Sequence, residues 1–388
     1  MAELIETAQA EPTAKNVTLK KRLLSLDVLR GATIAAMILV NDPGDWQHIY
    51  PPLEHSKWNG CTPTDLIFPF FLFMVGVSIV YSMETKRLDA ANHGKMIWRA
   101  FRRMVTLIVI SWLIQLFYHP SIANLRIPGV LQRIAVVYFI CTVLYIKTSP
   151  KVLDWVFGFA LIGYWLLMTL VPVPGVGYAN LNPETNLGAW IDRSVWGVNH
   201  LWRESHTWDP EGLLGTLPAI GTGLFGIRVA GWLKRGDRED GVKVSWMFTY
   251  GVIAVVLALF WDLFFPINKA LWTSSFVLYA GGLATIALAL CYWLIDVHGH
   301  KRFAWLFVVF GMNAITAYIL ADFVPGIIDF WKVNFNGHQL KGTEYLYQAF
   351  IAPHFAPINA SLVRAILFVV LIWLLMYVFY KKKIIIKV

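Results

Sequence analysis

The side chains best suited to chemistry lie in one polar stretch, residues 41–65, between two apolar runs. His55 is flanked there by carboxylate, hydroxyl and indole groups. Histidine titrates near neutral pH, so it can take a proton from an amine or a hydroxyl, and it can also accept an acyl group itself. Asn41 begins the stretch with an amide donor that could stabilise an oxyanion. The pair is therefore a candidate catalytic site. The alternative for His55, taken alone, is a hydrogen-bonded loop residue.

The composition indicates a membrane protein. Of the 388 residues, 57% are hydrophobic and only 15% are charged, and the mean hydropathy is +0.56. A soluble protein carries about a quarter charged residues, so this chain has too few polar side chains to cover a water-facing surface. These numbers exclude a cytosolic enzyme, a disordered protein and a secreted disulfide scaffold. The three cysteines are far apart, so we expect neither a disulfide framework nor a metal site.

The apolar runs predict the elements that must position the polar stretch. A membrane helix needs roughly 20 mostly apolar residues. We therefore expect an all-α fold, a polytopic bundle of about ten transmembrane helices, as one domain over residues 23–380. A polar tail (1–22) precedes it and a basic tail (381–388) follows it. The expected spans are 23–41, 64–83, 99–117, 127–147, 152–171, 211–230, 245–265, 274–295, 303–323 and 361–380.

The distribution of basic residues predicts the orientation. With the N-terminus inside, 23 of the 33 lysines and arginines fall in cytoplasmic segments and 7 fall in external loops. Cytoplasmic loops are enriched in these residues, so both termini are predicted to be cytoplasmic. The net charge of +9 then reflects topology and not nucleic-acid binding. The long segments 42–63, 172–210 and 324–360 become external, as expected of loops that cover a site.

Several polar residues fall within the predicted helices, where a charge costs about 2.5–3.5 kcal/mol. Asp27 and Arg30 are three residues apart, so they share a helix face and can partly neutralise each other. The alternative is that both snorkel to the inner interface. Asp65 could cap the second helix or take part in catalysis. Gln132 and Arg133 lie too deep for easy snorkelling, so we expect them to face the bundle interior or a polar cavity.

Three further motifs have structural interpretations. Asn313 is predicted to hydrogen-bond between helices or to line the same cavity. Residues 221–226 (GTGLFG) match a dinucleotide-binding fingerprint, but they lie inside an apolar run without a preceding strand. We interpret them as small residues that allow close helix packing. The sequence HGH at 298–300 lies in a short basic turn and is interpreted as a solvated loop.

Several blocks of the sequence resemble the heparan-α-glucosaminide N-acetyltransferase family. The resemblance runs from about residue 20 to the C-terminus, and its first two blocks are long enough to be specific. The opening block is also similar to a broader group of membrane acyltransferases that modify sugars. The blocks are 24–31 (LSLDVLRG) with 37–41 (MILVN), 55–71 (HxxWNGxTxxDLxFPxF), 129–135 (GVLQRIA), 209–212 (DPEG), 269–273 (KxLWT) and 311–314 (GMNA).

The resemblance implies transmembrane acetylation. Acetyl-coenzyme A would be supplied from the cytosol, and the acetyl group would be delivered to the amine of a terminal glucosamine on the far side. The catalytic histidine and asparagine of the family match His55 and Asn41. The resemblance also suggests a homodimer. Because the lysosomal member has a lumenal domain before its first helix, whereas this chain begins close to its first apolar run, we expect a bacterial homologue in the inner membrane.

Acetyl-coenzyme A carries phosphate charges that cannot cross lipid, so its nucleotide should stay at the basic inner face. The candidate cofactor-binding residues are Arg99, Arg102 and Arg103, although topology alone also explains them. The pantetheine arm would thread a polar cleft towards the outer loops. The candidate substrate-binding residues are Trp58, Asp209 and Glu211; anchoring at the membrane interface is the alternative for the tryptophan.

Two mechanisms and two other functions remain open. His55 could deprotonate the amine in a ternary complex, which we prefer, or it could be acetylated first in a ping-pong sequence. The acceptor could instead be a hydroxyl group of an envelope polysaccharide. A bundle with buried charges would also suit a transporter for a sugar or an anion.

Overall fold

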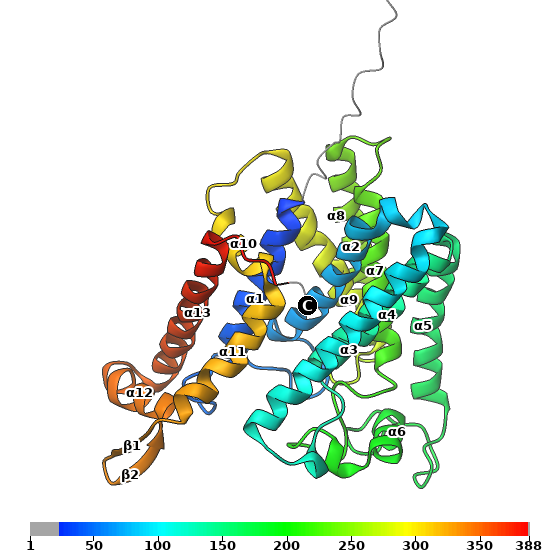
Figure 1. Ribbon diagram of the computed structural model, residues 1–388. Helices are drawn as coiled ribbons and strands as arrows, with labels where there is room; N and C mark the ends of the chain where they lie inside the picture. Colours follow the sequence, from blue (N-terminus) through cyan, green and yellow to red (C-terminus); the bar gives the residue numbers. More distant parts are fainter. Residues whose placement is uncertain (1–22, 387–388) are drawn as a thin grey trace, which may run out of the picture.

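The computed structural model describes residues 23–386, so the predicted N-terminal tail and the last two residues lie outside the described part of the chain. The described chain is a bundle of helices with one small hairpin at its edge (Figure 1). The first half contains α1 (Leu24–Asn41), α2 (Ile67–Arg87), α3 (His93–Tyr118), α4 (Val130–Lys147), α5 (Pro150–Leu170), α6 (Leu187–Trp196) and α7 (Thr216–Leu233). The second half contains α8 (Asp240–Asp262), α9 (Ser274–Cys291), α10 (Ala304–Met312), α11 (Ala314–Asp329), β1 (Lys332–Phe335), β2 (His338–Lys341), α12 (Gly342–Phe350) and α13 (Pro357–Lys381).

Eight helices between residues 23 and 386 are long and apolar enough to cross a membrane, and a bent pair, α10 with α11, could be a ninth span. Each of the ten predicted spans corresponds to helical structure. The span predicted at 211–230 begins later, at α7, and α7 is not among the eight. A mostly helical fold with several helices able to cross a membrane is therefore supported, whereas the predicted count of about ten spans is not confirmed.

α7 is the most enclosed of these helices. It packs against α2, α4, α5 and α9, and most of its residues are buried. A helix that is apolar on all sides belongs in the interior of a bundle. Its GTGLFG segment lies against α2: a Cβ atom added to Gly226 would come within 2.0 Å of the Phe73 carbonyl oxygen, and one added to Gly76 within 2.0 Å of the Gly223 carbonyl oxygen. The interpretation of this motif as a close helix contact is confirmed.

The span predicted at 303–323 is broken. α10 and α11 meet at an angle of 79°, and Asn313 between them has φ −132° and ψ 49°, outside the helical region. The Asn313 side chain satisfies the backbone of another segment: its Nδ2 donates to the Ile384 carbonyl oxygen and its Oδ1 accepts from the Ile386 amide, both at 2.9 Å. A continuous hydropathy window could not reveal this bend, because the residues on both sides of it are equally apolar.

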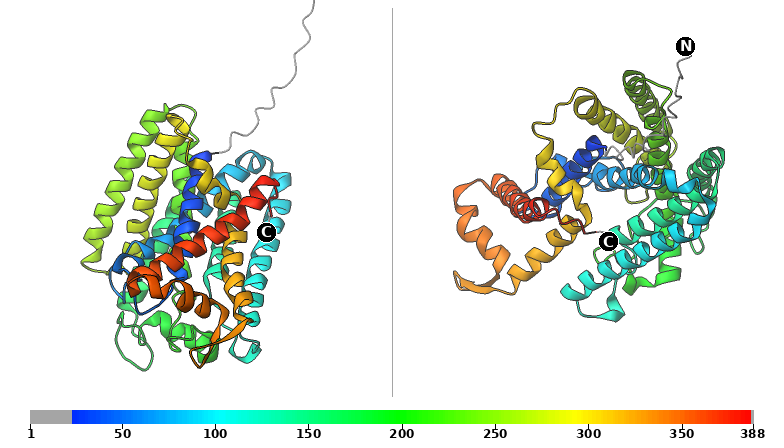
Figure 2. Two further views of the ribbon diagram at one scale, coloured as in Figure 1. Left: turned by 90° about the vertical axis from the view of Figure 1, so that its left-hand side faces the viewer. Right: turned by 45° about the horizontal axis from the view of Figure 1, so that its top comes forward.

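The first helix, α1, occupies the middle of the molecule. Figure 2 shows it between a group formed by α10, α11 and α13 and the rest of the bundle, and it contacts members of both groups. The long connections, with α6, the hairpin and α12, lie together at the lower end in Figure 1. The short basic connections lie at the opposite end. We call these the loop end and the basic end.

The contact of α2 with α7 predicts a sharp difference between two glycines of one helix. Gly226→Leu should destabilise the protein by about 1–3 kcal/mol or more, because the new side chain meets α2 backbone that cannot move aside. Gly231→Leu, which meets no atom within 4 Å, should have little effect. Thermal unfolding of the purified variants in detergent would measure both, and equal melting temperatures would contradict the packing described here.

Candidate active site

The His55 imidazole is oriented by a buried carboxylate. Its Nδ1 lies 2.7 Å from Asp65 Oδ1, and the Asp65 side chain is fully buried whereas that of His55 is half exposed. A carboxylate only accepts hydrogen bonds, so in the neutral imidazole the proton lies on Nδ1 and the lone pair on Nε2. This arrangement gives His55 the geometry of a base that is oriented by a carboxylate.

Asp65 also holds the loop that carries His55. Its second oxygen, Oδ2, accepts from the Ser56 amide at 3.1 Å and from the Thr62 amide at 3.0 Å. Neither α2 nor the short turn Thr64–Leu66 before it has a side-chain cap. The capping alternative for Asp65 is therefore wrong: the carboxylate is directed back into the 54–62 loop.

His55 and Asn41 line one small cavity at the loop end, with a volume of about 130 Å³. We call it the loop-end cavity. Its wall is mostly apolar, with side chains from α1, α2, α4 and α11, and its acidic and basic residues besides His55 are Glu211 and Lys269. The predicted pair thus comes together from the end of α1 and from the following loop.

Sequence reasoning did not assign a role to Lys269, yet its Nζ lies 3.4 Å from His55 Nε2. Burial lowers the pKa of the Lys269 ammonium, partly offset by the negative charges of Glu211 and Asp65. The residue opens the KxLWT block, which was the only signal in the sequence. Its distance from His55 along the chain gave no hint that they meet.

A second cavity, of about 850 Å³, opens at the basic end. We call it the basic cavity. It is lined by the three candidate cofactor-binding residues of α3 and by Arg30 of α1. Arg103 also lies over the Tyr138 ring, with its guanidinium carbon 4.8 Å from the ring centroid. The predicted basic cluster therefore faces an interior space as well as the surface of the basic end.

The two cavities share part of their walls. Phe71, Ile134 and Ile315 line both of them. These side chains, from α2, α4 and α11, form an apolar neck between the basic cavity and the loop-end cavity. The two cavities thus adjoin inside the bundle, with these three apolar side chains between them.

Asp27 and Arg30 form the predicted ion pair, with Arg30 Nη1 3.1 Å from Asp27 Oδ1. Asp27 is buried. Arg30 reaches sideways into the bundle, where its Nη2 donates to Ser78 Oγ at 2.7 Å and its Nη1 donates to the Gly311 carbonyl oxygen at 3.3 Å. The snorkelling alternative does not fit these contacts. Asn313 lines the basic cavity as well. It therefore both hydrogen-bonds the backbone of residues 384–386 and faces a cavity.

Gln132 and Arg133 are buried, as predicted, but neither lines either cavity. Arg133 donates to the carbonyl oxygens of Pro210 and Gly212, each at 2.9 Å. Gln132 Oε1 accepts from Ser111 Oγ at 2.9 Å. Arg133 thus fixes the 209–212 turn against α4.

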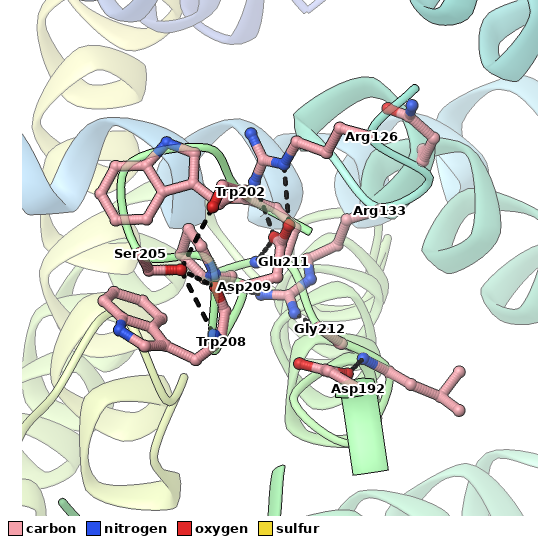
Figure 3. Close-up of polar contacts among 12 residues, drawn as sticks. Arg126, Arg133, Asp192, Trp202, Ser205, Trp208, Asp209, Glu211 and Gly212 are labelled. Atoms are coloured by element: carbon pink, nitrogen blue, oxygen red, sulfur yellow. Dashed lines mark hydrogen bonds and ion pairs between the residues drawn. The ribbon is translucent and has the colours of Figure 1, made fainter. Parts of the chain in front are cut away.

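A cluster of opposite charges lies beside this turn (Figure 3). Arg126 donates to Asp209 through Nε at 2.8 Å and Nη2 at 2.6 Å, and to Glu211 Oε2 at 2.6 Å. Burial would lower the pKa of Arg126, but the hydrogen bond and charge of Asp209, with the charge of Glu211, raise it. Asp209 is fully engaged here, whereas Glu211 also faces the loop-end cavity.

Three tryptophans cover the same end of the bundle. Trp58 meets Trp208 edge to face, with ring centroids 5.1 Å apart, and Trp208 meets Trp202 in the same way at 5.2 Å. The Trp58 indole donates to the Leu181 carbonyl oxygen at 3.0 Å. The cluster therefore joins the His55 loop to the long 171–186 and 197–215 segments.

Removing the cation from the charge cluster should destabilise the loop end. Arg126→Met leaves two buried carboxylates without their counter-ion, at a cost of the order of 3 kcal/mol. Arg203→Met, at an exposed arginine of the same end, should leave the melting temperature unchanged. Thermal unfolding gives the melting temperature of both variants. An Arg126→Met protein that melts at the wild-type temperature would show that the cluster does not stabilise the fold.

Residues 22–259 match the family described as heparan-alpha-glucosaminide N-acetyltransferase, catalytic. The chain is also 30% identical to the heparan-alpha-glucosaminide N-acetyltransferase of Homo sapiens, over 82% of this chain and 55% of the relative. It is 30% identical to the protein of the same name from Mus musculus, over 93% of this chain and 60% of the relative. The chain thus spans less than two thirds of the length of these relatives. The matched residues 22–259 include His55 and Asn41, while Lys269 lies beyond them.

Proposed function

Because the chain belongs to the heparan-alpha-glucosaminide N-acetyltransferase family, we propose that it transfers acetyl groups across a membrane. Acetyl-coenzyme A enters at the basic end, and the amine of a glucosamine-type sugar receives the acetyl group at the loop end. The observation that carries this proposal is the pair of cavities that meet at Phe71, Ile134 and Ile315. One cavity offers cations and the other offers the His55 imidazole.

The same proposal assigns sides to the bundle. The basic end faces the cytoplasm, since cytoplasmic loops are enriched in lysine and arginine. Both chain termini then lie in the cytoplasm, and the loop end faces the periplasm of a bacterial inner membrane. Phosphate groups remain where water and arginine side chains stabilise them, and only the uncharged pantetheine arm enters the neck.

The basic cavity has the chemistry that a nucleotide needs. Guanidinium groups bind phosphate through charge-assisted hydrogen bonds, and Arg99, Arg102 and Arg103 lie on adjacent turns of one face of α3. The Nε of Arg103 is buried without a hydrogen-bond partner among the described residues. The volume of the basic cavity, about 850 Å³, is in the range of sites for cofactor-sized ligands.

At the loop end, His55 acts as the general base in a ternary complex. The amine nitrogen attacks the thioester carbonyl carbon, a C–N bond forms, and His55 Nε2 takes the amine proton. Asp65 stabilises the imidazolium through Nδ1. Asn41 donates to the carbonyl oxygen as it gains negative charge. The C–S bond then breaks, and the imidazolium returns the proton to the coenzyme A sulfur.

The half exposure of His55 favours this direct route over an acetylated histidine. An acetyl-imidazole is reactive towards water, and the His55 side chain is not enclosed. Glu211 lies in the wall of the same cavity, where its carboxylate can accept a hydrogen bond from the sugar amine. Trp58, at the edge of the site, offers an apolar face to a sugar ring.

Purified protein incubated with acetyl-coenzyme A and a panel of amino and neutral sugars tests the function directly. Thiol release coupled to an acetylated amine, identified by product mass, is the expected result. Acetylation of a hydroxyl group but not of an amine would contradict the proposed amine acceptor and indicate an O-acyltransferase. Uptake of sugar into vesicles without any thiol release would overturn the enzyme proposal in favour of a transporter.

Replacement of the base should abolish most turnover without affecting the fold. His55→Ala is expected to lower kcat by about 10²–10⁴-fold, and Asn41→Ala by about 10²–10³-fold. His48→Ala is the matched control, since His48 is an exposed histidine of the same loop that pairs with Asp45. Initial rates of thiol release give the comparison. Full activity of His55→Ala would remove the imidazole from the mechanism.

The basic cavity makes a separate prediction about the donor. Arg102→Ala should raise KM for acetyl-coenzyme A roughly tenfold or more, the value of one charge-assisted hydrogen bond. It should leave KM for acetyl-pantetheine, which lacks the nucleotide phosphates, unchanged. Arg238→Ala, at an exposed arginine of the basic end that pairs with Asp237, should alter neither value. An equal change for both donors would place the phosphates elsewhere.

A further inference from the structure

Among the described residues 23–386, Lys269 is the one lysine or arginine in the wall of the loop-end cavity. Its Nζ lies 3.4 Å from the base nitrogen Nε2 of His55. It is therefore within reach of any acyl group that His55 could serve. The residue opens the family-like KxLWT block, but it lies beyond the matched residues 22–259 and was not part of the predicted catalytic pair.

We propose that Lys269 is a catalytic residue of the acetyl transfer, donating a hydrogen bond to the thioester carbonyl oxygen as negative charge develops there. This inference rests on the proposed function and adds a cation to it. In the empty site the ammonium donates to His55 Nε2 and occupies the lone pair of the base. When the thioester enters, the ammonium turns to the carbonyl oxygen, and the lone pair becomes free to take the amine proton.

The turn that carries Lys269 is unusually well anchored. The Gly60 amide donates to the Ile267 carbonyl oxygen at 2.7 Å, and Asn268 Nδ2 donates to Asn59 Oδ1 at 3.1 Å. These bonds tie the Lys269 turn to the His55 loop. Both groups are therefore held as one unit, as a reacting pair requires.

Trp272 fixes the other side of the turn. It is fully buried, and its backbone adopts φ 54°, a conformation that side-chain-bearing residues rarely take. Its indole donates to Thr222 Oγ1 at 3.1 Å and packs edge to face on Phe68 and Phe276. Strained backbone that is held by its surroundings is concentrated at functional sites. Here it presents the lysine three residues earlier to the cavity.

The charges around the ammonium suit a donor to an oxyanion. Asn41 supplies one neutral donor, and a transition state that carries a full negative charge gains more from a nearby cation in a site with a low dielectric constant. Burial lowers the pKa of Lys269, and the negative charge of Glu211 in the same wall opposes this effect and favours the ammonium. As the C–N bond forms, the π electron pair of the carbonyl group moves to its oxygen, where the Lys269 ammonium is already in place to stabilise the negative charge. When the C–S bond breaks, the pair returns to the carbonyl, and Lys269 keeps its proton throughout.

The competing role for Lys269 is structural: it could merely orient the His55 ring through Nε2. The two roles differ in their response to the acceptor. Hydroxylamine is uncharged at neutral pH and strongly nucleophilic, so it depends far less on a base than a sugar amine does. It still needs stabilisation of the oxyanion, because the same tetrahedral intermediate forms.

The test compares Lys269→Met, His55→Ala and wild type with glucosamine and with hydroxylamine as acceptors, after subtraction of the rate without enzyme. Lys269→Met should lower kcat by about 10²–10³-fold with both acceptors, and KM for acetyl-coenzyme A should stay close to that of the wild type. The His55→Ala defect should shrink with hydroxylamine. Lys269→Arg, which keeps a cation, should recover part of the activity. Lys57→Met, at an exposed lysine of the same loop end, is the matched control.

The outcomes separate the two proposals. If the Lys269→Met defect shrinks with hydroxylamine in parallel with that of His55→Ala, the lysine only positions the imidazole and the inference is wrong. If Lys269→Met is as active as wild type, the inference also fails, while the proposed function stands. If the wild type acetylates neither acceptor, the proposed function itself fails and the inference falls with it. Lys269→Gln supplies a second neutral side chain should the methionine variant not fold.

Discussion

The buried carboxylate of Asp65 is the interaction on which the loop end depends. One of its oxygens orients the His55 ring, and the other accepts from two backbone amides of the loop between them. A carboxylate without solvent is stable only when its lone pairs are occupied in this way. These hydrogen bonds hold the loop against Asp65, and the His55 ring that they orient lines the loop-end cavity. Arg133 likewise holds a turn with one side chain, because it donates hydrogen bonds to two carbonyl oxygens of the 209–212 turn.

The sequence was a good guide wherever local chemistry decides the structure. Runs of apolar residues located the helices, because a membrane leaves the backbone few other options. The three-residue spacing of Asp27 and Arg30 predicted their ion pair, because residues three apart share one face of a helix. The small residues of GTGLFG indicated a close helix contact, and α2 does lie against them. In each case the prediction needed only the residue types and spacing within one segment, or the general properties of a membrane.

The sequence was a poor guide where distant segments meet. Nothing local to Asn313 revealed that its amide would pair with the backbone near residue 385, or that the helix would bend there. Asp65 looked like a helix cap because Thr and Pro precede it, but its partners all lie upstream, at His55, Ser56 and Thr62. Lys269 reaches His55 across 214 residues of chain. The engagement of Asp209 by Arg126 depended equally on the tertiary fold.

The apolar neck has a consequence beyond the passage of an acyl arm. A continuous water path through the bundle would dissipate the ion gradients of any membrane that contained it. Phe71, Ile134 and Ile315 offer no oxygen or nitrogen to replace the hydration shell of an ion. A proton relay would likewise lack side chains along which to pass. The constriction can thus act as an electrical insulator between the two cavities, so that the proposed acyl transfer would not open a path for ions across the membrane.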